Sequence, residues 1–179
     1  MEILCFGDSN TYGYDPRDYF GRSYDKPWPL LLAEKSNWKV QNLGENGREI
    51  PKFPVRFTEN CDLLVIMLGT NDLLQGNTVE VVKKRMEGFL LGLNQKESRI
   101  LLIAPPPMKP GEWVQTLSLI ESSNELSFAY QSLSQRLGVR FVNAGEWNIT
   151  MAFDGVHFTE AGHRAFAEGL YQYLINEGV

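Results

Sequence analysis

Cysteine and long apolar runs are scarce in this chain, and each shortage argues against a class of protein. Two cysteines among 179 residues are too few for a disulfide framework. Cys5 lies in an apolar run and Cys61 just before another, so we expect both to be buried free thiols. No run approaches the ~18 apolar residues that a membrane-spanning helix needs. The sequence therefore predicts neither a disulfide-stapled protein nor a membrane span.

Positive charge is not in excess either. The chain has 17 Lys and Arg against 22 Asp and Glu, a net charge of −5, so we expect no nucleic-acid partner. Glu2 stands where a secretory signal peptide would carry basic residues, which favours a cytoplasmic location. At ~150 residues per domain, residues 1–179 are expected to form a single domain.

Apolar runs alternate with amphipathic segments along the chain, which is typical of an α/β fold. Residues 3–6, 63–68 and 100–104 are apolar throughout, as in strands that helices cover on both faces. Residues 38–42 and 140–142 are weaker candidates that suit the edges of a sheet. With right-handed crossovers, this pattern predicts a five-stranded parallel sheet of order 2-1-3-4-5.

The helices are predicted from apolar residues that recur at helical spacing. Such stripes run through residues 79–93, 126–137 and 166–174, and a shorter helix is expected to begin at residues 27–29, because proline suits a first turn. Asn77 and Glu80 resemble a capping box. Gly138 is expected to end the second stripe.

A distinctive loop follows each predicted strand. Gly7-Asp8-Ser9-Asn10 follows the first strand, a glycine-containing loop at residues 42–47 follows the second, and Gly69-Thr70-Asn71-Asp72 follows the third. In a parallel sheet these loops gather at the carboxyl edge, and the switch point of this order lies between strands one and three. Ser9 and Asn71 are therefore expected to face each other there, although a helix cap and an Asx turn are ordinary explanations of the two residues.

A serine hydroxyl becomes a nucleophile only when a base takes its proton. His157 is the better of the two histidines, because Asp154 precedes it by three residues and can orient its ring. His163 lies within the last predicted helix, where a solvated or structural role is expected. The backbone N–H of Gly47 and the amide of Asn71 could donate hydrogen bonds to a developing oxyanion.

The segments around Ser9, Gly47 and Asn71, together with Asp154-Gly155-Val156-His157, resemble in order the four blocks of the SGNH hydrolases, also called GDSL esterases and lipases. The likeness runs from Phe6 to the last helix. It implies a flavodoxin-like three-layer α/β/α sandwich.

The resemblance also implies roles for individual residues. It makes Ser9 the nucleophile and one oxyanion donor, Gly47 and Asn71 the other donors, His157 the base and Asp154 its orienting acid. Gly44 is an alternative to Gly47. It implies a small-molecule ester substrate and neither a metal nor an organic cofactor.

The expected activity is a serine esterase acting on short-chain or acetyl esters. Asn10 stands where the family name has leucine, and this variant, with Tyr12-Gly13 and the Ala104–Pro107 segment, is similar to the arylesterase and acetyl-transfer subgroup. The aromatic residues expected to line the substrate pocket are Tyr12, Tyr14, Trp28, Trp113 and Phe153.

Other functions stay open at this point. A lysophospholipase or thioesterase would belong to the same family. A metal-dependent phosphoesterase could use the polar residues that follow the strands, namely Asp8, Asn10, Asn71, Asp72 and His157. A non-catalytic flavodoxin-like binding module could cradle phosphate in the glycine loops. The oligomeric state is also left open.

Overall fold

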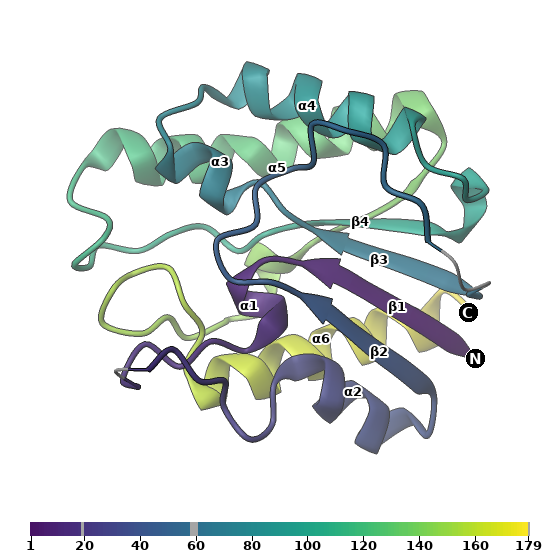
Figure 1. Cartoon of the computed structure of the whole chain (residues 1–179), viewed down its shortest axis with the longest axis horizontal. Coiled ribbons are helices and arrows are strands. Elements are labelled where there is room, and N and C mark those ends of the chain that lie inside the picture. Colours follow the sequence, from purple (N-terminus) through teal and green to yellow (C-terminus); the bar gives the residue numbers. More distant parts are fainter. Residues whose placement is uncertain (19, 58–60, 179) are drawn as a thin grey trace.

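A five-stranded parallel sheet forms the centre of the computed structural model, which describes residues 1–18, 20–57 and 61–178 (Figure 1). The strand order is β2-β1-β3-β4-β5, which confirms the predicted α/β fold and its order. The strands are β1 (Glu2–Gly7), β2 (Lys39–Gly44), β3 (Leu63–Met67), β4 (Ile100–Ala104) and β5 (Arg140–Asn143).

Helices cover both faces of the sheet. In Figure 1, α2 and α6 lie below the sheet and α3, α4 and α5 lie above it, so the described chain has three layers. The α-helices are α1 (Ser9–Tyr12), α2 (Trp28–Ser36), α3 (Thr70–Leu74), α4 (Val79–Leu91), α5 (Leu117–Leu137) and α6 (Glu160–Asn176). Two short 3₁₀ turns, η1 (Glu97–Arg99) and η2 (Ala144–Glu146), flank β4 and β5.

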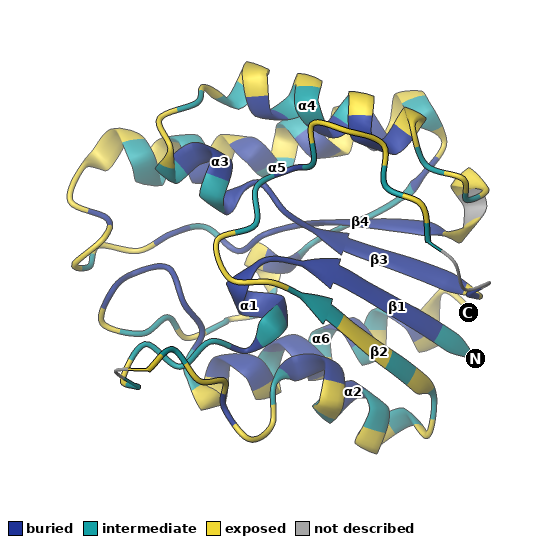
Figure 2. Cartoon of the chain, viewed as in Figure 1, coloured by how far each residue is buried: buried dark blue, intermediate teal, exposed yellow. Residues whose placement is uncertain are grey.

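Burial follows the predicted ranking of the strands. Every residue of β3 and β4 is buried, whereas β2 is exposed or half-buried along its length (Figure 2). The sheet separates two apolar clusters, one under α4 and α5 with Leu64 and Tyr130, the other under α2 and α6 with Trp28 and Phe166. Full burial of an apolar side chain such as Leu64 or Phe166 contributes about 1.5–3 kcal/mol to the stability of the fold. Both predicted free thiols are buried.

The helix ends agree with the sequence signals at two places and differ at one. Helix α2 begins beside Pro29, and Gly138 ends α5 in the left-handed conformation at φ 71°, as predicted. The capping box at Asn77 is wrong. Thr78 is the N-cap of α4 and accepts a hydrogen bond from the Val81 amide, while the Asn77 side chain donates to the carbonyl of Asp72 at 2.8 Å.

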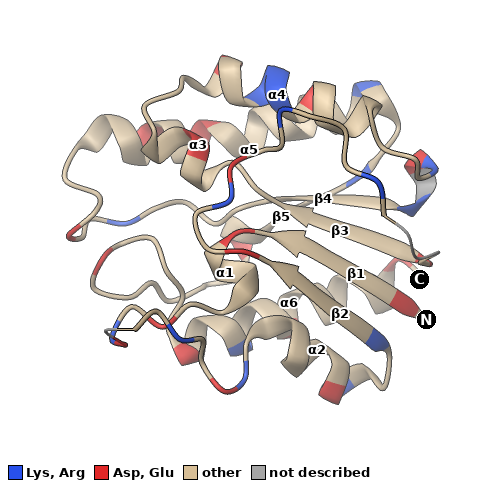
Figure 3. Cartoon of the chain, viewed as in Figure 1, with Lys and Arg blue, Asp and Glu red and all other residues tan. Residues whose placement is uncertain are grey.

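The carboxyl ends of the strands point to one edge of the sheet, on the left in Figure 1, and both termini lie on the opposite side. Among the described residues, every helix is either too short or too polar to cross a lipid bilayer. Figure 3 shows Lys and Arg interspersed with Asp and Glu, and some of these pair between helices, as Arg136 of α5 does with Glu87 of α4 at 2.6 Å. The loops at the carboxyl edge carry the candidate functional residues.

Candidate functional site

Ser9 is the first residue of α1, and Asp8 alone separates it from β1. The carboxylate of Asp8 caps this one-turn helix by accepting a hydrogen bond from the Asn10 amide at 3.0 Å. Gly7 allows the tight entry, because a Cβ there would lie 2.1 Å from Oγ1 of Thr11 and 2.9 Å from the carbonyl of Met67. The local sequence therefore holds the Ser9 hydroxyl at the carboxyl end of β1.

His157 and Asp154 approach Ser9 from the far end of the chain. Nε2 of His157 lies 3.0 Å from Oγ of Ser9, and Nδ1 lies 2.6 Å from Oδ2 of Asp154. Oδ1 of Asp154 accepts hydrogen bonds from the backbone amides of Val156 and His157, each at 2.9 Å. The structure thus brings the three candidate residues into one hydrogen-bonded chain, and all three are buried.

The pKa values of Asp154 and of the neighbouring Asp8 are shifted in opposite directions. Burial acts to raise the pKa of Asp154, but the hydrogen bonds from the His157 ring and from backbone amides outweigh it, so the pKa is lowered. Burial raises the pKa of Asp8 to about 6 against the lowering effect of the Asn10 amide and of His157. Asp154 is therefore the carboxylate that faces the imidazole as a stable anion near neutral pH.

The Asn10 side chain joins the loops that carry Ser9 and His157. Its Nδ2 donates to the carbonyl of Val156 at 3.0 Å, and its Oδ1 accepts from the amide of Phe158 at 2.9 Å. Both partners flank His157, so one amide side chain fixes the histidine loop against α1. Sequence reasoning noticed Asn10 but missed this role, for which a lone asparagine after the serine gives no local signal.

Asn71 lies at the start of α3, beyond a turn that depends on Gly69. Gly69 has φ 121°, and a Cβ there would lie 2.6 Å from the hydroxyl of Tyr130. That buried hydroxyl donates to the carbonyl of Leu68 at 3.0 Å. The turn therefore packs closely on α5, and this packing fixes the position of Asn71 at the edge of the sheet. Sequence reasoning assigned Tyr130 to the core stripe alone.

Asp72, a candidate metal ligand in the phosphoesterase hypothesis, is engaged by protein groups. One oxygen accepts from the Ile50 amide at 2.9 Å and the other from Nη1 of Arg85 at 2.8 Å. Burial raises the pKa of Asp72, although these donors oppose the shift. Within the described ranges, no group of three His, Cys, Asp or Glu side chains is arranged to hold a metal ion.

A cavity of about 180 Å³ opens over the Ser9 hydroxyl. Its lining residues come from the loops after β1, β2, β3 and β4 and from the histidine loop: Ser9, Tyr14, Asn46, Gly47, Asn71, Trp113 and His157. Asn46 was missed by sequence reasoning, and its position beside Gly47 was the available signal.

The two candidate glycines of the second loop differ in their surroundings. Gly47 has φ 73°, and a Cβ there would meet no described atom within 4 Å, so its backbone faces open space at the cavity. A Cβ at Gly44 would lie 2.1 Å from the backbone nitrogen of Tyr12. Gly44 packs against α1, so Gly47 is the one of the two that lines the cavity.

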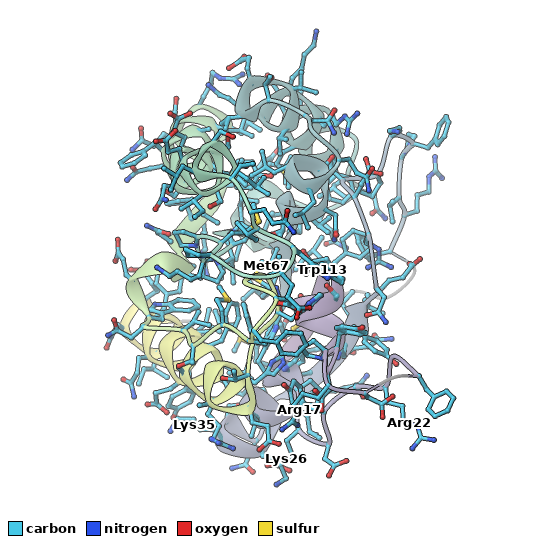
Figure 4. The ribbon with its side chains drawn as sticks, turned by 90° about the vertical axis from the view of Figure 1, so that its left-hand side faces the viewer. Arg17, Arg22, Lys26, Lys35, Met67 and Trp113 are labelled. Carbon is cyan, nitrogen blue, oxygen red and sulfur yellow. The ribbon has the colours of Figure 1, made fainter. Side chains whose placement is uncertain are left out.

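Two of the predicted aromatic residues lie against His157. The Tyr14 ring is 4.6 Å from the imidazole ring, and the Trp113 ring is 5.0 Å from it in an edge-on arrangement. Trp113 is half exposed and lies near the centre of the sheet edge in Figure 4, whereas Arg17 and Lys26 lie toward α2 and α6. Tyr14 and Trp113 therefore form walls of the cavity.

Three of the aromatic predictions are not supported by the structure. Trp28 is fully buried in the first turn of α2 and packs on Phe166 at 4.6 Å, so its placement in the substrate pocket is wrong. Tyr12 lies outside the cavity, on the side where α1 meets Gly44. Phe153 lines a separate hollow beside Tyr24. The sequence predicts that an aromatic residue lies near the carboxyl edge of the sheet, but it does not determine the direction in which the ring points.

His163 lies on α6 and is fully buried. It is not the histidine that contacts Ser9. Its Nδ1 accepts a hydrogen bond from the amide of Trp28 at 3.3 Å, and its ring packs edge-on against Tyr24 and Phe158. Burial, helped by the charge of His157, lowers the pKa of His163 from 6.5 to about 4. The imidazole is therefore a neutral packing group at neutral pH.

Replacing His163 with Asn should weaken the acid sensitivity of the fold. Unfolded histidine takes a proton near pH 6.5, whereas the low pKa of folded His163 delays this to about pH 4. The stabilisation from neutral His163 is thus complete above pH 6.5 and is lost as the pH falls toward 4. Between pH 7 and pH 4 the parent should lose about 3 kcal/mol more unfolding free energy than His163→Asn.

Denaturant unfolding of both proteins at pH 7 and pH 4 measures this difference. Other acidic groups, such as Asp8 and Asp154, are present in both proteins, so their contributions cancel. Equal losses in the parent and the variant would contradict the assignment of a neutral buried imidazole.

The chain is similar to known proteins in sequence and in structure. The sequence model of the GDSL-like lipase/acylhydrolase family matches residues 5–165. A comparison with curated proteins found no match. Among solved structures, the native aryl esterase of M. smegmatis is similar, with 25% identity over 98% of each chain and a TM-score of 0.80. A carbohydrate acetylesterase family member from Sinorhizobium meliloti has 26% identity over 100% of both chains and a TM-score of 0.79.

Proposed function

The chain belongs to the GDSL-like lipase/acylhydrolase family and is a carboxylic ester hydrolase, and we propose that Ser9, His157 and Asp154 are its catalytic triad. One observation carries the proposal, the 3.0 Å contact between Nε2 of His157 and the Ser9 hydroxyl, with Asp154 at 2.6 Å on the other ring nitrogen. That order of groups is the arrangement a serine nucleophile needs. The Ser9–His157–Asp154 hydrogen bonds are buried, yet Ser9 and His157 also line a cavity, which supports catalytic roles over purely structural ones.

The proposed reaction has two acyl-transfer steps. Asp154 accepts a hydrogen bond from Nδ1–H of His157, which leaves Nε2 free to take the Ser9 proton as Oγ attacks the ester carbonyl. The alcohol leaves with that proton, and an acyl group remains on Ser9. Water then attacks the acyl-enzyme as His157 takes one of its protons. His157 passes this proton to Oγ of Ser9 as the acyl–oxygen bond breaks, which releases the carboxylic acid and restores the Ser9 hydroxyl.

The negative oxygen formed in each step is proposed to bind three donors around the cavity: the backbone amides of Ser9 and Gly47 and the side-chain amide of Asn71. Nδ2 of Asn71 already donates to the carbonyl of Arg48 at 3.0 Å, and its second N–H is available for the substrate. The open left-handed turn at Gly47 lets a substrate approach its backbone. Such donors typically contribute a factor of about 10²–10³ each in rate.

The proposed substrates are short-chain esters, acetyl esters foremost. The cavity of about 180 Å³ is small beside the ~300–1,000 Å³ pockets that enclose drug-sized ligands. Tyr14 and Trp113 flank the imidazole that protonates the leaving group, so they offer flat surfaces to an aryl or sugar alcohol. The solved aryl esterase and carbohydrate acetylesterase relative support the same substrate class. Lysophospholipids and long-chain thioesters are less suited to so small a cavity.

A series of p-nitrophenyl esters measured with a metal chelator present tests this proposal. The acetate and butyrate should be hydrolysed with a kcat/KM about tenfold or more above that of the octanoate, because each surplus methylene that the pocket rejects costs ~1–3 kcal/mol. The chelator should leave these rates unchanged.

Turnover of p-nitrophenyl phosphate that the chelator abolishes would favour the metal-dependent phosphoesterase. Absence of all turnover would favour the binding module. Preference for the octanoate would overturn the short-chain assignment while leaving the esterase itself in place.

A further inference from the structure

Arg48 is a charged residue that the proposed reaction does not use, yet its guanidinium is turned into the protein. It follows Gly47, and only 18% of its side chain is exposed. Its guanidinium carbon lies 4.2 Å from the centre of the Phe6 ring, and Nη2 pairs with the exposed carboxylate of Glu45 at 2.6 Å. Ordinary surface arginines keep their charged ends in water, so this inward placement calls for a function.

The guanidinium closes the end of the sheet where β1 and β2 separate. Gly7 and Gly44 are the last paired residues of the two strands. Nη1 of Arg48 donates to the carbonyl of Gly7 at 2.9 Å and also to the carbonyl of Leu43. Gly7 is two residues before Ser9, and Leu43 leads into the loop that carries Gly47. One nitrogen therefore ties the nucleophile loop to the glycine loop.

The backbone of Arg48 contacts the third loop. Its carbonyl accepts the hydrogen bond from Nδ2 of Asn71 at 3.0 Å, and this contact orients the amide that faces the cavity. Arg48 thus contacts each of the segments that carry the proposed oxyanion donors, which are Ser9, Gly47 and Asn71. It is itself absent from the cavity lining, so it touches no reacting atom.

We propose that Arg48 is a positioning residue that sets the spacing of the oxyanion donors, an inference that rests on the proposed esterase function. The planar guanidinium presents its donors in a fixed geometry, and its charge strengthens each hydrogen bond to a carbonyl. Oxyanion donors act only when they lie 2.7–3.1 Å from the developing charge. A displacement of about 1 Å in such a site can cost about 10²-fold in rate. Arg48 therefore controls the rate of the chemical step without taking part in it.

Arg48→Met is the direct test, because methionine keeps an apolar stem over Phe6 and removes every donor. Its kcat for p-nitrophenyl acetate should fall by about 10- to 100-fold, whereas KM should change by less than about twofold because ground-state binding is untouched. Arg48→Lys keeps the charge without the planar fork, and its kcat should lie between those of the parent and Arg48→Met.

An aryl trifluoromethyl ketone gives a second readout that a merely structural role would not move. This inhibitor forms a negatively charged adduct on the serine, so its inhibition constant should rise in proportion to the loss in kcat. Arg99→Met is the matched control. Nη1 of Arg99 also donates to a backbone carbonyl, that of Cys61 at 3.5 Å. Cys61 precedes the amino end of β3, whereas the candidate site lies at the carboxyl ends of the strands. It should keep the parent's kcat and inhibition constant.

The outcomes separate this inference from the proposed function. An unchanged kcat in Arg48→Met, or a lower kcat with an unchanged inhibition constant, overturns the positioning role while Ser9 remains the nucleophile. Full activity of Ser9→Ala would overturn the proposed function itself. If Arg48→Met does not fold, Arg48→Lys decides by the same two measurements: a lower kcat with a proportionally weaker inhibitor supports the role, and parent values for both overturn it.

Discussion

Ser9→Ala should lower kcat for p-nitrophenyl acetate by about 10⁴- to 10⁶-fold, because the proposed acyl-enzyme forms on the Ser9 hydroxyl. The fold should be unaffected. Among the described residues, the Ser9 hydroxyl is hydrogen-bonded to His157 alone, and α1 takes its cap from Asp8. Alanine is also a strong helix former. Initial rates of the parent and the variant, with circular dichroism of both, measure the effect.

A fluorophosphonate probe supplies the matched control for this variant. The parent should be labelled covalently at Ser9, and Ser9→Ala should take up no label although its fold is intact. Near-normal turnover by Ser9→Ala, or equal labelling of both proteins, would show that another residue is the nucleophile.

His157→Ala should produce the second large loss, about 10⁴-fold or more in kcat, because members of a triad act as a unit. Nε2 of His157 is the ring nitrogen 3.0 Å from the Ser9 hydroxyl, so its removal leaves the serine without a base. Steady-state rates at neutral pH, with thermal unfolding as a check on the fold, measure the loss.

The protein contains its own control for this result. His163 is also buried, but its Nδ1 accepts a hydrogen bond from the Trp28 amide and it does not contact the Ser9 hydroxyl. His163→Asn should therefore keep most of the parent's kcat while losing some stability. Equal losses of kcat in the His157 and His163 variants would contradict the choice of base.

Much of the fold was predictable because strand burial leaves a direct mark on composition. The unbroken apolar runs at residues 63–68 and 100–104 correspond to β3 and β4, which helices cover on both faces. The polar alternation at residues 38–42 corresponds to the exposed edge strand β2. Once the strand order is known, the loops that carry Ser9, Asn71 and His157 must share one edge, so residues from both ends of the chain could be brought together by argument alone.

The features that escaped prediction depend on the direction in which a side chain turns. Trp28 looks like a residue of the site edge in the sequence, but the first turn of α2 rotates it onto Phe166 in the core. No local sequence signal marks Arg48, whose guanidinium donates to the carbonyls of Gly7 and Leu43, the first of them 41 positions away along the chain. Neither rotation nor long-range bonding is encoded in local spacing.

The Asn10 link between α1 and the histidine loop has a consequence for the newly made protein. Its bonds to Val156 and Phe158 span 146 and 148 positions, so they can form only after the chain through Phe158 has left the ribosome. Ser9 is translated 148 positions before His157, its proposed base, and the two meet only when this later segment docks. Hydrolysis should therefore appear only after the segment through Phe158 has left the ribosome, and ribosome-bound chains that stop before it should be catalytically silent.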